Sequence, residues 1–151
     1  MYRKILAPLD GSNLSESIMP IARGLVSDSA GAAELILYTA IEPFRSQPFG
    51  FGPEWAEKMK NEAEKVARTY LDQLAEKLRA EGIKVGVVVE HGDPANSIMD
   101  FVKKNGVDLI VMSTHGRSGI SRLVFGSVAD KIVHHSAVPV LIAAPPGLRT
   151  S

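Results

Sequence analysis

The 151-residue chain contains no cysteine and no excess of charge of either sign. Without cysteine it has no disulfide scaffold, no thiolate zinc site and no cysteine nucleophile. Lys plus Arg and Asp plus Glu each number 17, so the formal net charge is zero. Because nucleic-acid-binding proteins carry a basic surface, nucleic acid would need a local basic patch here, and we expect no nucleic-acid partner.

Long apolar runs are also absent. The run near the N-terminus, Ile5 to Leu9, is too short for the core of a signal peptide and leads directly into a charged turn. No run approaches the roughly 18 to 20 apolar residues that a membrane-spanning helix requires. We therefore expect a soluble, unprocessed, cytoplasmic protein that does not enter a membrane.

Several catalytic and nucleotide-binding signatures are missing. The chain has no G-x-x-x-x-G-K-[ST] Walker loop, and no G-x-G-x-x-G follows its first expected strand. Asp10, His115 and Ser127 have the chemistry of a hydrolase triad, but the G-x-S-x-G turn that presents the serine is absent. We therefore assign no catalytic residue.

The four histidines give no metal-ligand pattern. His134 and His135 are adjacent on an expected helix, so their side chains point to different faces. His91 and His115 lie in separate loops without a pair of carboxylates at ligand spacing. We expect no metal site built by these residues alone.

The chain does contain a regular alternation of apolar strands and amphipathic helices. The expected strands lie around Ile5–Ala7 and at Glu34–Ile41, Val85–Val89, Val107–Ser113 and Val138–Ala144, and the expected helices at Ser12–Ser27, Glu54–Glu81, Pro94–Asn105 and Ser127–His135. This order predicts one α/β domain over residues 1–146, an open parallel sheet with helices on both faces, followed by a tail at 147–151.

The longest helix is expected to lie along the core. Its apolar residues recur every three or four positions, at Trp55, Met59, Ala63, Val66, Tyr70, Leu74 and Leu78. The segment before it, residues 42–53, is rich in Pro, Gly and Phe and has no helical or strand period. Such a loop either folds against the body of the protein or serves as a lid or partner-binding loop.

The last strand has the features of a sheet edge. Pro139 lies within it, and sheets tolerate proline mainly in edge strands. An exposed edge at Val138–Ile142 would be prone to aggregation unless another chain pairs with it. The sequence therefore predicts a homodimer formed through this strand.

Two segments with unusual chemistry follow expected strands, "APLDGS" after the first and "STHGRSGISRLVFGS" after the fourth. Ligands of open parallel sheets bind at the carboxyl ends of strands, where the strand order reverses. If both segments belong to one site, the first and fourth strands are neighbours. The predicted strand order is therefore 3-2-1-4-5.

The second segment has the chemistry of a phosphate site. Glycines let backbone N–H groups approach an anion, and Gly126-Ser127 opens a helix whose N-terminus favours negative charge. Arg117 or Arg122 could pair with a phosphate, and Asp10 could accept from a ribose hydroxyl or a base amine. Composition alone equally supports a simple turn in which Ser127 only caps the helix.

At these residues the chain resembles the universal stress protein family, whose loop reads G-x2-G-x9-G-[ST]. The corresponding residues here are Ser113, Gly116, Gly126 and Ser127, with nine residues between the two glycines. "ILAPLDGS", "VDLIVMSTHG" and "VPVLIA" are also similar to family segments. The resemblance covers the whole chain, less so residues 43–60.

The resemblance implies a Rossmann-like, adenine nucleotide alpha hydrolase-like sheet of five parallel strands in the order 3-2-1-4-5. It also implies homodimers that pair their fifth strands, and ATP binding accompanied by Mg²⁺ or Mn²⁺. By position, Pro8 and Asp10 would lie at the adenine and ribose, with Ala40 beside the base. Met112, His115 and Gly116 would line the base and ribose, and Gly126, Ser127, Val128 and Ala129 would face the phosphates.

Two positions depart from the family pattern. Ser113 replaces the first loop glycine, where its side chain either crowds the ligand or adds a hydrogen bond, and Ala129 lacks a hydroxyl that some ATP-binding members carry there. The leading expectation is an ATP-binding regulator or sensor of the stress response, with slow ATP hydrolysis at most. The alternative is a dimeric interaction module that binds no nucleotide. A nucleotidyl transferase is not expected, because "THGRSG" lacks the second histidine of the H-x-G-H motif.

Overall fold

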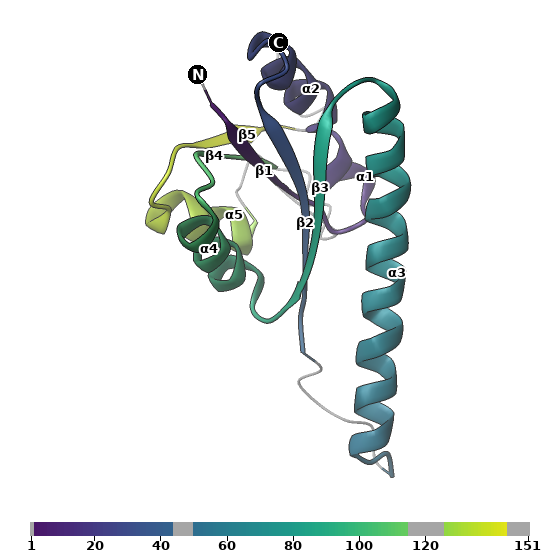
Figure 1. The fold of residues 1–151 in the computed structure, drawn as a ribbon. Helices are drawn as coiled ribbons and strands as arrows, with labels where there is room; N and C mark the ends of the chain where they lie inside the picture. Colours follow the sequence, from purple (N-terminus) through teal and green to yellow (C-terminus); the bar gives the residue numbers. More distant parts are fainter. Residues whose placement is uncertain (1, 44–49, 115–125, 145–151) are drawn as a thin grey trace.

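The computed structural model describes residues 2–43, 50–114 and 126–144. In chain order the elements are β1 (Lys4–Pro8), α1 (Asn13–Glu16), α2 (Met19–Asp28), β2 (Glu34–Ile41), α3 (Pro53–Ala80), β3 (Lys84–His91), α4 (Pro94–Asn105), β4 (Leu109–Ser113), α5 (Ser127–His135) and β5 (Val140–Ala143) (Figure 1). All four strand pairings are parallel, and the sheet order is β3-β2-β1-β4-β5. The predicted fold class and strand order are confirmed.

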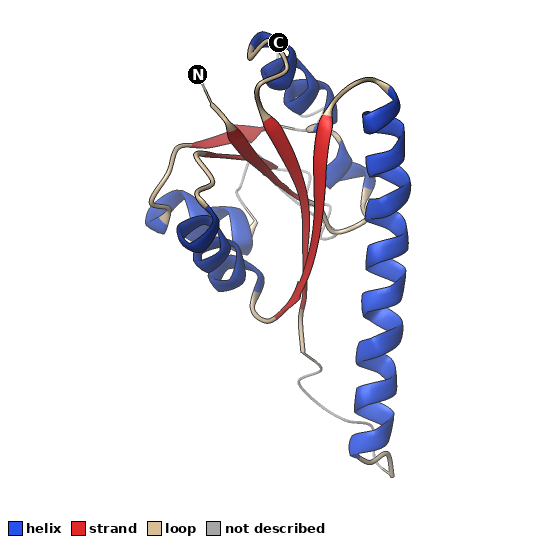
Figure 2. Cartoon of the chain, viewed as in Figure 1, coloured by secondary structure: helices blue, strands red, loops and turns tan. Residues whose placement is uncertain are grey.

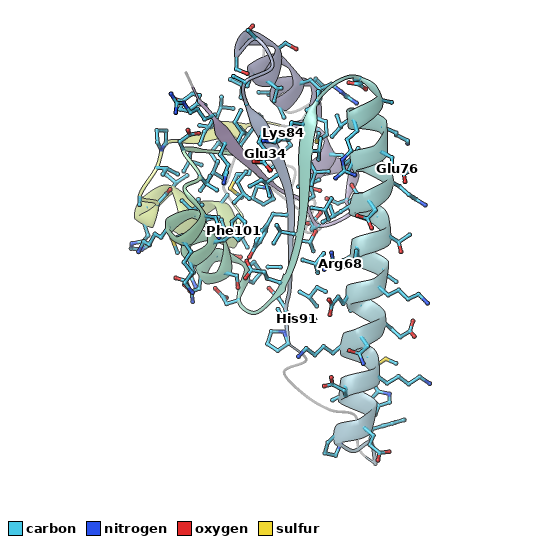
Figure 3. All side chains as sticks on the ribbon, in the orientation of Figure 1. Glu34, Arg68, Glu76, Lys84, His91 and Phe101 are labelled. Carbon is cyan, nitrogen blue, oxygen red and sulfur yellow. The ribbon has the colours of Figure 1, made fainter. Side chains whose placement is uncertain are left out.

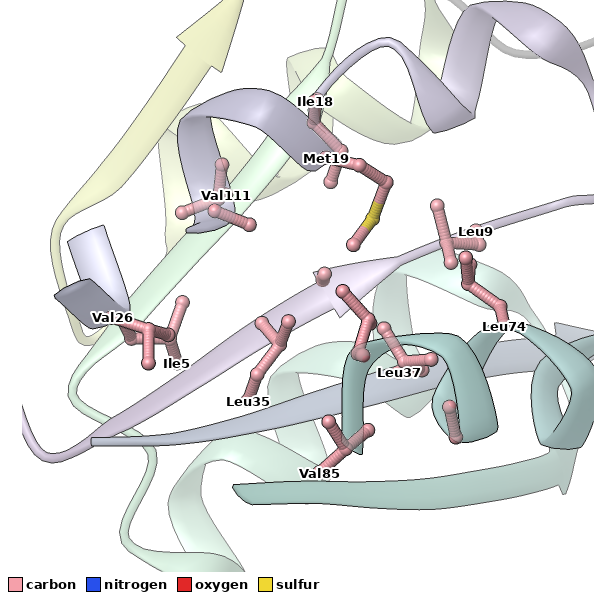
Figure 4. Close-up of a cluster of buried hydrophobic side chains, with 14 of the residues drawn as sticks. Ile5, Leu9, Ile18, Met19, Val26, Leu35, Leu37, Leu74, Val85 and Val111 are labelled. Atoms are coloured by element: carbon pink, nitrogen blue, oxygen red, sulfur yellow. The ribbon is translucent and has the colours of Figure 1, made fainter. Parts of the chain in front are cut away.

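The helices form a layer on each face of the sheet (Figure 2). Successive strand side chains point to opposite faces, so β2 contributes to two separate apolar clusters. Ile36 and Tyr38 pack with residues of α4 and α5, and Phe101 of α4 joins that cluster (Figure 3). Leu35 and Leu37 pack with residues of α2 and α3 (Figure 4). Burial on both faces explains why the central strands are largely apolar.

The first predicted helix is two helices in the structure. Ser12 caps α1, because its Oγ accepts a 3.1 Å hydrogen bond from the backbone N–H of Ser15. Pro20 then lies in the first turn of α2. A proline ring clashes with the carbonyl four residues earlier, which is that of Glu16, where α1 ends. The prediction of one continuous helix from Ser12 to Ser27 is therefore wrong.

The long helix α3 is confirmed, but only its C-terminal half packs on the core. Leu71, Leu74, Ala75 and Leu78 are buried, whereas Val66 is 69% exposed. The N-terminal half of α3 runs past the end of the sheet (Figure 1). The expectation that every apolar position of this helix faces the core is therefore wrong for its first half.

Helix α4 begins and ends where the sequence predicts. The Asp93 carboxylate accepts a 3.1 Å hydrogen bond from the backbone N–H of Asn96, and Pro94 occupies the first turn. At the other end, Gly106 adopts a left-handed backbone with φ of 65°. This helix places Pro94 and Ile98 beside the carboxyl ends of the strands.

Strand β5 forms one edge of the sheet and pairs with β4. Pro139 precedes the strand and does not lie within it, and its carbonyl accepts a 3.1 Å hydrogen bond from the backbone N–H of Ile110. The edge position is confirmed, and pairing of two chains through this edge stays a prediction. Of the predicted loop at 42–53, residues 44–49 lie outside the described residues.

The lengths and compositions of the described helices show whether any of them could cross a membrane. Among residues 2–43, 50–114 and 126–144, no helix has both the length and the apolar character needed to cross a membrane.

Candidate functional site

A cavity of about 1030 Å³ lies at the carboxyl ends of β1, β2 and β4. It includes the position between β1 and β4 at which the strand order reverses, where open parallel sheets bind their ligands. Nine residues that the sequence predicted for the site line it: Pro8, Asp10, Ala40, Met112, Ser113, Gly126, Ser127, Val128 and Ala129. The other two, His115 and Gly116, lie outside the described residues, as do Arg117 and Arg122.

The turn that carries Asp10 is fixed from two sides. The backbone N–H of Leu9 donates to the carbonyl of Tyr38 at 2.8 Å, and the Thr39 hydroxyl donates to the carbonyl of Leu9 at 2.8 Å. Asp10 then accepts at Oδ1 from the backbone N–H of Ser12 at 2.9 Å. This short-range aspartate turn holds the carboxylate at the mouth of β1.

The N-terminus of α5 forms the opposite wall. Gly126 precedes the helix, donates from its N–H to the Thr114 carbonyl at 2.7 Å, and contributes no capping side chain. The backbone N–H groups of the first turn have no partner within an α-helix, and together with the helix dipole they favour an anion. Ser127, Val128 and Ala129, the first three residues of α5, all line the cavity.

Ser113 is the last residue of β4 and lies in register with Ala143 of β5. It is buried, with 6% of its surface exposed, and it lines the cavity. The serine therefore occupies a regular strand position in the wall of the site. A glycine there would remove a side chain from this wall without requiring a different backbone.

Two tyrosines that were not predicted for the site from the sequence also line the cavity. Tyr38 of β2 and Tyr70 of α3 each have a buried hydroxyl that makes no hydrogen bond with the described residues. Burial raises the pKa of Tyr38 far above its usual range, and Glu90 adds to this effect. Burial likewise raises the pKa of Tyr70, with contributions from Glu16 and then Asp10. Both phenols are therefore neutral, and neither belongs to a motif that could have revealed it.

Helix α3 supplies a further wall that the sequence analysis assigned to the core. Six of its residues line the cavity: Met59, Glu62, Ala63, Val66, Ala67 and Tyr70. The length of the helix could have revealed this wall. A 28-residue α-helix is longer than the eight-residue strand beside it, so part of the helix must extend past the strand.

The described part of the lining carries three carboxylates, on Asp10, Glu42 and Glu62, and no Lys, Arg or His. Among these described residues, only the backbone amides at the start of α5 favour an anion. Within the described ranges, no group of three or more His, Asp or Glu side chains is placed to hold a metal ion. The chemistry of this wall is that of a binding site with one acidic, one apolar and one amide-rich part.

Comparison with known proteins identifies relatives along nearly the full chain. The model of the universal stress protein family matches residues 1–144. Universal stress protein YxiE of Bacillus subtilis is 32% identical over 148 residues, covering 94% of this chain and 99% of YxiE. Universal stress protein MJ0531 of Methanocaldococcus jannaschii is 30% identical over 146 residues, covering 97% of this chain and 84% of MJ0531.

Solved structures share the fold. The structure of protein MJ0577 of M. jannaschii superposes with a TM-score of 0.86 at 26% identity, covering 97% of this chain and 99% of that one. A family member from Arabidopsis thaliana solved with AMP bound has a TM-score of 0.69 at 17% identity, covering 96% and 93%. A universal stress protein in complex with cAMP has a TM-score of 0.68 at 24% identity, covering 94% and 97%. From its sequence match and its fold together, this chain belongs to the universal stress protein family.

Proposed function

We propose that this chain binds an adenine nucleotide, ATP with Mg²⁺ or Mn²⁺, and acts as a nucleotide-dependent regulator or sensor in the stress response. The observation that carries the proposal concerns nine residues that the family resemblance assigns to the nucleotide. They come from four separate segments of the chain and line one cavity. Two proteins of the same fold bind AMP and cAMP, which supports an adenine nucleotide as the ligand class.

Each part of the cavity suits one part of the nucleotide. Pro8, Ala40 and Met112 offer an apolar surface for the base, and the Asp10 carboxylate offers an acceptor for a ribose hydroxyl. The amides and hydroxyl at residues 126–129 suit the phosphates. The described lining has no Lys, Arg or His to balance the phosphate charge, which favours a nucleotide whose phosphates carry a divalent cation.

Isothermal titration calorimetry with ATP and Mg²⁺ tests this proposal, with GTP as the control for the base. We expect saturable binding of ATP and a rise in melting temperature, because the ligand binds the folded state alone. Asp10→Asn keeps the acceptor for Ser12 but removes the charge, so it should weaken ATP binding about 10-fold without unfolding the protein. Absence of both heat and a thermal shift at millimolar ATP would refute nucleotide binding.

The alternative is a dimeric interaction module that binds no nucleotide, and the buried position of Ser113 favours it. Comparing ATP binding by wild type and Ser113→Gly separates the two functions. If the serine side chain excludes the ligand, the glycine variant binds ATP and wild type does not. In either case, sedimentation velocity should show a dimer that dissociates when Ile142→Pro removes a backbone donor from the free edge of β5.

A further inference from the structure

The cavity extends across the carboxyl ends of the strands to both faces of the sheet. Met112, Val128 and Ala129 belong to the face covered by α4 and α5. On the other face, the six lining residues of α3 lie opposite Thr39 and Ile41 of β2. We call this second part the α3 lobe. None of the eleven predicted nucleotide positions belongs to α3, so the proposed nucleotide leaves this lobe unassigned.

Most of the wall of the α3 lobe is apolar, and its short side chains leave room for a ligand. Ala63 and Ala67 have short side chains, and Met59 and Val66 add flexible and branched apolar surface. Val66 is 69% exposed, an unusual state for an apolar residue that faces a cavity. Covering such surface with an apolar group is favourable in proportion to the area removed from water.

The two parts of the cavity meet at the nucleoside end of the proposed ligand. Ala40, expected beside the base, lies between Thr39 and Ile41, whose side chains point to the α3 face. Asp10, expected at the ribose, lines the same cavity as Tyr70 of α3. The phosphate-binding end, at Gly126, is on the other side of the sheet.

The charges of the lining also favour a nucleotide that has its nucleoside end at the α3 lobe and its phosphates at α5. Glu62 in the α3 lobe and Glu42 after β2 both line the cavity, and both repel phosphate. The total volume of about 1030 Å³ is at the upper end of the roughly 300–1,000 Å³ typical of small-molecule sites. The cavity therefore has space for a group beyond the nucleotide, and that group is not anionic.

We propose that the α3 lobe binds an apolar group carried on the base or ribose of an adenine nucleotide. This inference rests on the proposed nucleotide binding and deepens it, because it names the class of nucleotide that fills the whole cavity. An unmodified nucleotide fills the part at β4 and α5 and leaves the α3 lobe open. The substituted nucleotide contacts α3 as well. Its binding therefore links the site to the part of that helix that extends past the sheet.

Calorimetry with four ligands tests the inference: ATP, N6-benzyl-ATP, 2′/3′-O-(N-methylanthraniloyl)-ATP, and the γ-phenyl ester of ATP. One of the two nucleoside-substituted ligands should bind about 10-fold more tightly than ATP, and which one does so identifies the base or the ribose as the attachment point. The γ-phenyl ester should gain nothing, because its phenyl group lies at the phosphate end. If ATP binds and neither nucleoside-substituted ligand binds more tightly, the inference is wrong while nucleotide binding stands. If none of the four binds, both proposals fail.

Two variants locate the added affinity. Ala67→Leu fills the lobe, so it should abolish the gain of the substituted ligand while ATP affinity stays within about twofold. Thr69→Leu adds the same side chain at an exposed position of α3 outside the cavity and should leave both affinities unchanged. An unchanged gain in Ala67→Leu would contradict the placement of the substituent. Val66→Gln, at an exposed position, gives a second test in which polarity and not volume reduces the gain.

Discussion

The hydroxyl of Thr39 donates a 2.8 Å hydrogen bond to the backbone carbonyl of Leu9, which joins the end of β2 to the residue before Asp10. Thr39→Val keeps the shape of the side chain but leaves that carbonyl without its donor. We expect a loss of about 1 kcal/mol in the free energy of unfolding, and weaker ATP binding because the Asp10 turn loosens. Urea denaturation and calorimetry measure the two effects. Thr39→Ser retains the hydroxyl and is the control; equal behaviour of the Val and Ser variants would contradict this role.

Gly24 and Gly92 are expected to respond oppositely to alanine. Gly24 lies exposed within α2 and has no atom within 4 Å of an added Cβ, so Gly24→Ala should raise the free energy of unfolding by about 0.5–1 kcal/mol. Gly92 has φ of 148°, and an added Cβ would lie 2.7 Å from the Oγ of Ser97. Gly92→Ala should therefore lower the free energy of unfolding by about 1–3 kcal/mol. Chemical denaturation of both variants in parallel checks the opposite signs.

The buried hydroxyl of Tyr38 is expected to contribute little to stability. It makes no hydrogen bond with the described residues, whereas the ring lies 5.4 Å from that of Phe101 between centroids. Tyr38→Phe keeps the ring contact and removes the unpaired hydroxyl, so stability should stay unchanged or rise by about 1 kcal/mol. Tyr38→Leu loses the ring contact and should be destabilised. A marked loss in the Phe variant would reveal a partner for the hydroxyl.

A hydrogen bond between Glu64 and His91 ties α3 to the end of β3, with 3.0 Å between Oε2 and Nε2. The hydrogen bond from His91 lowers the pKa of Glu64 in the folded protein. A carboxyl group with a lowered pKa stabilises the fold above its unfolded pKa of about 4.3, and this contribution is lost as the pH falls through the folded value. The stability difference between wild type and Glu64→Gln should therefore shrink as the pH is lowered below about 5.

Urea denaturation at a series of pH values measures this difference. Glu76→Gln provides the control, because Glu76 is an exposed glutamate of the same helix (Figure 3). This control measures the effect of removing one glutamate charge from α3 without touching the contact with His91. A constant difference for Glu64→Gln would mean that the contact with His91 does not form in solution.

The strand order was predictable because chemistry marks the ends of β1 and β4. Asp10 and Gly126-Ser127 are polar groups after apolar strands, and the adjacent strands β1 and β4 bring them to one cavity. Helix α4 was equally clear, since Asp93, Pro94 and Gly106 each act through local backbone geometry. Features governed by short-range sterics and by the alternation of elements can be predicted from the sequence alone.

The remaining features depend on where an element ends relative to its neighbours. Apolar spacing marks one face of α3, but it does not show that Leu71–Leu78 pack in the core whereas Val66 stays exposed. The tyrosine hydroxyls near Glu16 and Glu90 come from tertiary packing and have no local signature. The break between α1 and α2 was visible in Pro20, whose effect on Glu16 the apolar periodicity concealed.

The overhang of α3 gives one continuous helix two different stabilities. Its 28 residues extend about 42 Å, whereas the eight residues of β3 beside it extend about 26 Å. Because Leu71–Leu78 pack in the core, we expect amide protons around them to exchange only through large-scale opening. Those near the N-terminus of α3 exchange through local fraying, at rates set by whatever covers that end of the helix. Hydrogen exchange along this single helix thus reports separately on the integrity of the core and on the occupancy of the cavity.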